Sequence, residues 1–254
     1  MTSPDPLPAL LAPFRTRPDA AAVITDFDGT LSPIVLDPEG ARPLPGAVDT
    51  LHALAATYRR AVVVSGRPAR FLAEHLRVAE CPRLVAYGLY GLEWTDGEHV
   101  VEHPEAEQWR DVVASAVRAA QAEAPADVTV EHKGLALTLH VRVAPKEADW
   151  AAGWVVRQAA ETGLVVHPAR KSFELRPPMT VDKGTVVADL VQGMHAACFI
   201  GDDVGDLPAY DALDVAAESD GVHALRVAVR SAEAPPDLLE RADIKVDGPQ
   251  GALD

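Results

Sequence analysis

Short apolar runs that end in polar residues alternate with helical patterns in the first part of the chain. Residues 21–25 form an apolar run that leads into Asp26, and residues 61–64 form a second one. Between them, about 46–59 has the apolar spacing of a helix. Continuous apolar strands separated by helices are typical of a parallel sheet covered on both faces. We therefore expect a doubly wound, Rossmann-like α/β core, whose ligands bind beyond the carboxyl ends of the strands.

The pattern changes in the middle of the chain. Amphipathic helices are predicted at about 105–123 and 147–162, and each is followed by a pair of short strands. These strands are predicted at 128–132, 135–143, 164–166 and 172–175. Alternating helices and hairpins describe a small α+β unit on an antiparallel sheet. We predict that residues 105–177 form an inserted α+β domain and that residues 1–104 and 178–254 form the core.

The core has further predicted elements on both sides of the insert. They are a strand at 84–87, a hairpin over 92–101 around Asp96-Gly97, a helix at 183–194, a strand at 198–200, and short strands at Val215 and 227–229.

Composition and charge limit the possible partners. Hydrophobic residues make up 48% of the 254 residues and charged residues 24%, as in folded globular proteins. The formal net charge of −15 opposes binding to nucleic acid or anionic membranes, which need basic patches. Two cysteines give no disulfide framework, and no apolar stretch has the length of a signal peptide core or a membrane span. We expect a soluble, cytoplasmic monomer whose partner is a small molecule.

The segment Asp26-Phe27-Asp28-Gly29-Thr30 directly follows the first predicted strand. Its four fixed positions have a chance frequency on the order of one in a thousand in a chain of this length. Two carboxylates at i and i+2 in a turn can direct oxygens to one point, which suits a hard cation. The alternative is an ordinary Asx-turn, in which the carboxylates only cap main-chain amides.

A second acidic segment, Gly201 to Asp206, follows the predicted strand at 198–200. Its carboxylates on Asp202, Asp203 and Asp206 repel one another unless a cation or hydrogen bonds compensate. A metal ion is the simplest compensation. Alternatively, acids at this position favour the dipole of the following helix, which suits Asp206 in particular.

Two weaker signals lie at a strand end and at a helix start. Ser65-Gly66-Arg67 follows the second predicted strand, and Asp182-Lys183-Gly184 begins a predicted helix. A hydroxyl with free main-chain amides can cradle a phosphoryl oxygen, and a lysine can neutralise its charge. Alone, the first segment is more often an ordinary turn, and the lysine of the second is more often a surface residue. The two segments become informative because of their order along the chain.

In that order, the four segments resemble the motifs of the haloacid-dehalogenase (HAD) superfamily of phosphotransferases. Further segments resemble the trehalose-6-phosphate phosphatase family, and together they cover residues 26 to about 210. They are Asp26 to Pro33, Ser65 to Arg67, Tyr90 to Glu93, Glu131 to Lys133, Leu139 to Arg142, Phe173 to Pro177 and Lys183-Gly184. Two positions depart from the family pattern: Tyr90 stands where the family has histidine, and Gly205-Asp206-Leu207 where it has Thr-Asp-Glu.

The resemblance implies a HAD phosphatase that works through an aspartyl-phosphate. Asp26 would be the nucleophile, because an ionised carboxylate can attack phosphorus without a base. Asp28 would protonate the departing sugar oxygen and then take a proton from water. Ser65 and Lys183 would bind the phosphoryl oxygens.

The resemblance also implies a magnesium site in the core. Its residues would be Asp26, Asp28, Asp202 and Asp203, with the main-chain carbonyl of Asp28 as a ligand and Asp206 nearby.

Substrate binding would involve both parts of the chain, with the inserted domain as a cap that closes over the sugar. The implied residues are Ser65, Gly66 and Arg67 of the core and Glu131, Lys133, Glu174 and Arg176 of the cap. The ordinary alternative for the cap residues is a surface cluster of ion pairs.

We therefore expect hydrolysis of trehalose 6-phosphate to trehalose and inorganic phosphate. Three alternatives stay open: a phosphatase acting on sucrose phosphate, mannosyl phosphoglycerate or a hexose phosphate, a phosphomutase, and an inactive sugar-phosphate sensor.

Overall fold

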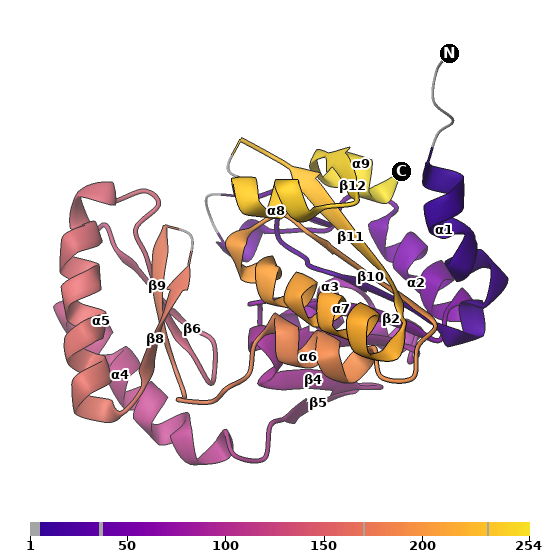
Figure 1. Cartoon of the computed structure of the whole chain (residues 1–254). Coiled ribbons are helices and arrows are strands. Elements are labelled where there is room, and N and C mark those ends of the chain that lie inside the picture. The colour runs from indigo at the N-terminus through magenta and orange to yellow at the C-terminus, as the bar shows by residue number, and fades with distance from the viewer. Residues whose placement is uncertain (1–5, 36–37, 170, 233) are drawn as a thin grey trace. The chain divides into compact units, whose positions relative to one another are not determined.

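The chain forms two compact units in a computed structural model (Figure 1). The described residues are 6–35, 38–169, 171–232 and 234–254. One unit, which we call the core, is Met1–Val100 with Val181–Asp254, and the other, the cap, is Val101–Thr180. No helix within the described ranges is long and apolar enough to cross a membrane.

The core is built on one eight-stranded sheet. The strands lie in the order β12-β11-β10-β1-β2-β3-β4-β5. Neighbours from β12 to β3 are parallel, and β4 pairs antiparallel with β3. The bounds are β1 Ala21–Thr25, β2 Arg60–Val64, β3 Leu84–Gly88, β4 Glu93–Asp96, β5 His99–Glu102, β10 Ala196–Gly201, β11 His223–Arg230 and β12 Ile244–Asp247.

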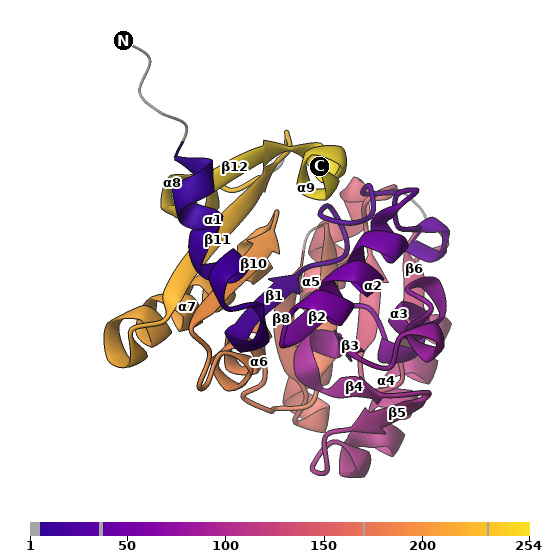
Figure 2. The same ribbon diagram turned by 90° about the vertical axis from the view of Figure 1, so that its right-hand side faces the viewer.

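Helices cover both faces of this sheet because its central strands are apolar on both sides. On β1, Ala22 and Ile24 pack against α6 and α7, whereas Ala21 and Val23 face α1. Helices α2 and α3 cover β2 and β3 on the face opposite α6 and α7 (Figure 2). The core helices are α1 Leu7–Thr16, α2 Ala47–Thr57, α3 Ala69–His75, α6 Lys183–Leu190, α7 Leu207–Asp220, α8 Pro236–Arg241 and α9 Gly248–Leu253. The predicted doubly wound α/β class is confirmed.

One predicted strand is wrong. Val215 lies inside α7, which continues from Leu207 to Asp220. The strand prediction there rested on a single valine, and that side chain is 62% exposed on the outer surface of the helix. An isolated exposed apolar residue on a helix is common and carries no information about strands.

The cap is a four-stranded antiparallel sheet in the order β6-β7-β9-β8, with two helices on one face. Its elements are α4 Arg110–Glu123, β6 Thr129–His132, β7 Leu137–His140, α5 Ala148–Thr162, β8 Val165–Ala169 and β9 Ser172–Arg176. Leu137, Leu139 and Leu175 pack with residues of α4 and α5. Since strand side chains alternate, Thr138 and Glu174 belong to the face away from these helices.

Candidate active site

Two aspartates lie where the adjacent central strands β1 and β10 end. The strands are parallel with Thr25 opposite Ile200, and the N–H of Asp26 donates to the carbonyl of Ile200 at 2.8 Å. Carboxylate oxygens of Asp26, Asp202 and Asp206 lie within 4.8 Å of one another, and all three residues are buried. We call these three residues the acidic cluster.

The turn after β1 lies close against the acidic cluster because Gly29 has no side chain. Gly29 has a φ of +82°, and a Cβ added there would lie 2.2 Å from Oδ2 of Asp202. This is far inside van der Waals contact. The glycine of the Asp-x-Asp-Gly segment therefore permits both the left-handed turn and the close approach of the Asp202 carboxylate.

Lys183 supplies a buried positive charge to the acidic cluster. Its Nζ lies 2.6 Å from Oδ1 of Asp206 and 2.8 Å from Oδ1 of Asp26, and the side chain is 4% exposed. It stands at the first residue of α6, which is capped by Asp182. Burial disfavours the charge, but the carboxylates of Asp206 and Asp26 outweigh it and raise the pKa of Lys183 well above its usual value. Lys183 is thus a permanently charged buried group and not a surface lysine.

Asp206 holds the second acidic loop in shape. Its Oδ2 accepts hydrogen bonds from the N–H groups of Asp202 and Asp203 at 2.8 and 3.0 Å, and its Oδ1 is paired with Lys183. Asp203, which the sequence placed in the metal site, lies outside the acidic cluster. Its Oδ1 accepts from the N–H of Gly205 instead.

Burial favours the protonated forms of Asp26 and Asp206 in the acidic cluster. Burial raises the pKa of Asp26 well above its usual value, Lys183 opposes this effect, and Asp206 and Asp202 reinforce it. Burial also raises the pKa of Asp206, again opposed by Lys183. Asp26 and Asp206 share the Lys183 ammonium group, and a cluster of buried carboxylate oxygens of this kind suits a bound cation.

Asp28 is held by Arg67 across the site. The Nε and Nη2 groups of Arg67 donate to Oδ2 and Oδ1 of Asp28 at 2.7 and 2.8 Å, a bidentate pair. The guanidinium also lies over the ring of Phe71, 5.0 Å from its centroid. The buried hydroxyl of Ser65 accepts from the main-chain N–H of Arg67 at 3.2 Å. The Ser-Gly-Arg segment is therefore tied to the Asp-x-Asp segment at neighbouring strand ends.

Tyr90, one of the two departures from the family pattern, packs on this same segment. A Cβ on Gly66 would lie 2.6 Å from the Tyr90 ring, and the N–H of Tyr90 donates to the carbonyl of Ser65 at 2.9 Å. Leu89 and Tyr90 both have positive φ, which the main-chain bond from Leu89 to Arg67 helps to hold. The tyrosine therefore fixes the loop that carries Ser65.

Within the cap, three of the predicted residues meet. Nζ of Lys133 lies 3.1 Å from Oε2 of Glu174 and 3.8 Å from Oε2 of Glu131. The hydroxyl of Thr138 donates to Oε2 of Glu174 at 3.0 Å, and Nε2 of His140 lies 2.6 Å from Oε2 of Glu131. The side chain of Glu174 is only 1% exposed and that of Lys133 10%. An exposed cluster of surface ion pairs does not describe this group.

Thr138 and His140 were not singled out from the sequence. The alternation of side chains along β7 could have identified them. Thr138 pairs with Glu174 across the sheet, so residues 138 and 140 lie on the same face as Glu174. Arg176, the remaining predicted cap residue, is buried and stands two residues after Glu174 on the same face of β9.

Comparison with known proteins connects both units to one family. The family model of trehalose-phosphatase matches residues 24–239. A trehalose-phosphate phosphatase of Mycobacterium marinum is 36% identical over 226 residues, which are 83% of this chain and 56% of that protein. This chain thus spans about half the length of the curated relatives it matches.

Solved structures agree with this assignment. The trehalose-6-phosphate phosphatase of Aspergillus fumigatus, in crystal form 3, is 26% identical with a TM-score of 0.62, and the match covers 96% of this chain and 93% of that one. A haloacid dehalogenase-like hydrolase from Bacteroides thetaiotaomicron, 18% identical with a TM-score of 0.59 and coverages of 92% and 97%, shares the fold.

Proposed function

Since this chain belongs to the trehalose-phosphatase family, we propose that it hydrolyses trehalose 6-phosphate to trehalose and inorganic phosphate. The observation that carries the proposal is the buried pair of Asp26 and Lys183 at the end of β1. One group is a carboxylate that can attack phosphorus, and the other is a fixed charge that can stabilise phosphoryl oxygens. The curated relative from M. marinum is named for this reaction.

In the proposed reaction, a carboxylate oxygen of Asp26 forms a bond to phosphorus as the bond from phosphorus to the sugar oxygen breaks. Asp28 donates a proton to the departing oxygen. A water molecule then attacks the phosphorus of the aspartyl-phosphate and gives its proton to Asp28, which releases phosphate and restores the Asp26 carboxylate. Arg67 positions Asp28 through the two hydrogen bonds that it donates to this carboxyl group.

Ser65, Gly66 and Lys183 bind the transferred phosphoryl group in this proposal. The hydroxyl of Ser65 already accepts a hydrogen bond from the N–H of Arg67, so its proton can be donated to a phosphoryl oxygen. Lys183 neutralises charge on another oxygen without moving far, because two carboxylates hold it. Positioning of this kind supplies most of the catalysis in phosphoryl transfer.

The acidic cluster fits a hard divalent cation, and Mg²⁺ is the ion proposed. All donors are oxygens, and the three buried carboxylates lie close together. Both oxygens of Asp206 are engaged, whereas Lys183 pairs with only Oδ1 of Asp26. The proposed ligands are therefore Asp26, Asp202 and the main-chain carbonyl of Asp28, with Asp203 shaping the loop. When bound, the ion would reduce the repulsion between nucleophile and phosphate.

Removal of divalent cations tests the metal proposal. Dialysis against EDTA should abolish phosphate release, and added Mg²⁺ should restore it. Full activity after exhaustive dialysis would refute the metal site.

In the cap, Glu131, Lys133, Glu174 and Arg176 are proposed to bind sugar hydroxyls. Glu174 has one carboxylate oxygen, Oε1, that accepts no hydrogen bond from any described residue, although the oxygen is buried. Buried polar atoms are rarely left in this state. A sugar hydroxyl would satisfy it.

A substrate panel tests the function itself. Phosphate release is measured with trehalose 6-phosphate, sucrose 6-phosphate, mannosyl phosphoglycerate and glucose 6-phosphate, and sugar products are identified. We expect the highest kcat/KM with trehalose 6-phosphate and free trehalose as product. A higher value for another sugar phosphate would reassign the substrate. Isomerised phosphate without release would indicate a phosphomutase, and no turnover on any member would indicate a sensor.

A further inference from the structure

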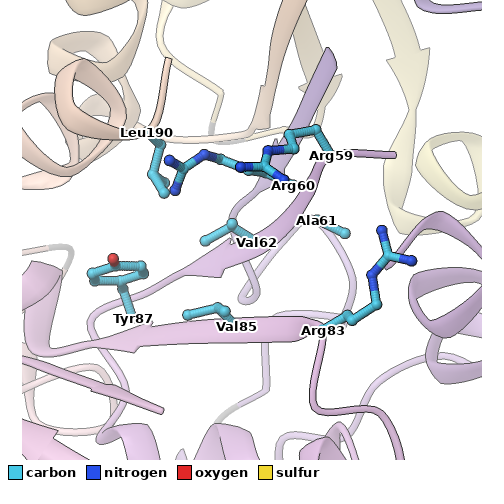
Figure 3. Close-up of a pocket in the computed structure, with 8 residues that line it drawn as sticks. All are labelled: Arg59, Arg60, Ala61, Val62, Arg83, Val85, Tyr87 and Leu190. Atoms are coloured by element: carbon cyan, nitrogen blue, oxygen red, sulfur yellow. The ribbon is translucent and has the colours of Figure 1, made fainter. Parts of the chain in front are cut away.

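Three arginines line a cavity of about 250 Å³ that runs along β2 and β3 from the N-terminal ends of these strands. They are Arg59, Arg60 and Arg83, and the apolar part of the cavity includes Val85, Tyr87 and Leu190. Figure 3 shows Arg59 and Arg60 on one side of the cavity and Val85 and Tyr87 on the other. We call it the arginine cavity.

The arginine cavity is distinct from the acidic cluster. Arg60 is the first residue of β2 and pairs with Ala22 near the start of β1, whereas Asp26 follows the end of β1. Four residues of strand separate positions 22 and 26, a distance of about 13 Å along the sheet. The cavity extends along β3 to Tyr87, which pairs with Val64, but a ligand held by Arg60 would lie at the opposite end of the strands from Asp26.

The positive charges of the arginine cavity are not neutralised by carboxylates. Within the described parts of the chain, neither Arg59 nor Arg60 forms an ion pair, and the buried Nε of Arg60 has no hydrogen-bond acceptor. Arg83 donates to the main-chain carbonyls of Ala56 and Tyr58 at 3.3 and 3.1 Å, which are neutral groups. In a chain with a net charge of −15, three such guanidinium groups in one place stand out.

One acidic side chain faces the same region. The pKa of Tyr87 is raised by burial, an effect that the positive charge of Arg60 opposes and the negative charge of Asp189 on α6 reinforces. Asp189 also accepts a hydrogen bond from Gln192. The three arginines line the cavity, whereas Asp189 is not among the lining residues.

We propose that the arginine cavity is a second anion-binding site, which takes a small phosphorylated compound carrying at least two negative charges. Guanidinium groups bind phosphate oxygens through paired hydrogen bonds, and Arg60 has a buried donor that needs an acceptor. The apolar surface of Val85 and Leu190 and the ring of Tyr87 can contact the body of such a compound. The cavity volume limits it to a compact molecule.

Inorganic pyrophosphate is the probe, and its binding to the full chain is measured by calorimetry without divalent cations. The wild-type protein should bind one pyrophosphate. Arg60→Gln should weaken binding by about 10-fold or more, as expected for a lost charge-assisted hydrogen bond. Arg77→Gln is the matched control, because Arg77 is a surface residue paired with Asp49 and lies outside the cavity. It should change the affinity by less than about twofold at physiological salt.

Three further variants make the result unambiguous. Arg83→Gln should weaken binding independently of Arg60, and Asp189→Asn should strengthen it severalfold by removing the competing charge. Ser65→Ala, at the other end of β2, should leave it unchanged. The proposal is overturned if pyrophosphate does not bind, if Arg77→Gln weakens binding as much as Arg60→Gln, or if Ser65→Ala abolishes it, because binding would then occur at the acidic cluster.

Discussion

Lys183 is proposed to contribute to both the stability of the core and catalysis. Its ammonium group forms ion pairs with the carboxylates of Asp26 and Asp206 inside the core. Loss of the lysine would leave buried negative charges uncompensated, and loss of both carboxylates would leave a buried positive charge uncompensated. Breaking a buried pair in this way costs about 3–5 kcal/mol in other proteins. The charge proposed to stabilise phosphoryl oxygens therefore also holds the loops after β1 and β10 together.

Asp26→Asn should remove turnover without unfolding the chain. The substitution keeps the volume of the side chain but removes the nucleophilic oxygen, so kcat for trehalose 6-phosphate should fall by about 1,000-fold or more. Circular dichroism should stay unchanged. Asp96→Asn, at the exposed last residue of β4, is the control and should keep full activity. Phosphate release by Asp26→Asn within threefold of wild type would exclude Asp26 as the nucleophile.

Asp26→Asn should also change how the free energy of unfolding depends on pH. Burial raises the pKa of Asp26 and Asp206 in the folded chain, so the folded state retains protons that the unfolded chain loses near pH 4. Each raised pKa contributes stability at low pH that is lost as the pH rises through the folded value. Asp26→Asn lacks the contribution of Asp26. Without divalent cations, its free energy of unfolding should therefore rise relative to that of wild type as the pH increases from 4 to 8. Urea titrations with EDTA measure the difference, and a difference independent of pH would contradict it.

At the scale of elements, the pattern of apolar residues locates the strands that carry the candidate site. β1, β2 and β10 are continuous apolar runs, so their ends at Asp26, Ser65 and Asp202 could be predicted from the amino-acid sequence. Helix α1 was not predicted, because Pro8 and Pro13 lie within it. Pro8 occupies the first turn, where proline is tolerated, but Pro13 is in the helix interior, where it usually is not.

Contacts between residues far apart in the sequence could not be predicted from the pattern of apolar and polar residues. Asp28 and Arg67 are 39 residues apart, and the sequence assigned Arg67 to the substrate. Lys183 and Asp206 are 23 residues apart, so a cation was expected where a lysine already supplies part of the compensation. Pairings of this kind depend on side-chain packing between elements, which periodicity along one chain does not encode.

Gly29→Ala tests the turn that follows β1. A methyl group there would meet the Asp202 carboxylate at 2.2 Å and would strain a residue with φ of +82°, so both the fold and the acidic cluster should suffer. We expect a loss of about 3 kcal/mol or more in the free energy of unfolding, together with most of the phosphatase activity. Gly97→Ala is the matched control, since Gly97 has φ of +59° with open space around its Cα. It should cost about 1 kcal/mol and leave activity intact. Equal effects of the two variants would show that the contact with Asp202 does not matter.

For the molecule as a whole, a net charge of −15 and an anionic substrate are compatible because the relevant charges are local. Exposed charges more than about 8 Å away are screened at physiological salt. Lys183 and the proposed cation would act at contact distance inside a buried site, where screening is weak. The core therefore contains the groups proposed for phosphoryl transfer, and the cap contains the residues proposed to bind the sugar.

If the core transfers phosphate and the cap binds the sugar, substitutions in the cap should affect activity on two substrates differently. Glu131→Ala or Glu174→Ala should lower kcat/KM for trehalose 6-phosphate by about 10- to 1,000-fold, because hydrogen bonds to sugar hydroxyls are lost. Hydrolysis of p-nitrophenyl phosphate, which has no sugar hydroxyls, should change far less. Glu161→Ala is the matched control: Glu161 is an exposed residue of α5 whose carboxylate contacts only Gln158 among the described residues. It should affect neither substrate.

The Glu174 variant needs a separate check on stability, because Glu174 is buried beside Lys133 and its removal takes away the shorter of that lysine's two ion pairs with Glu131 and Glu174. Glu174→Gln keeps the shape and one hydrogen-bonding oxygen, so it should stay folded and separate loss of sugar binding from loss of structure. If the cap merely stabilises the protein, activity on both substrates should fall together and in step with the fraction unfolded. Equal losses on both substrates, or no loss on either in a folded variant, would mean that these residues do not bind the sugar. A loss confined to trehalose 6-phosphate in a folded variant would support the proposal that these residues bind the sugar.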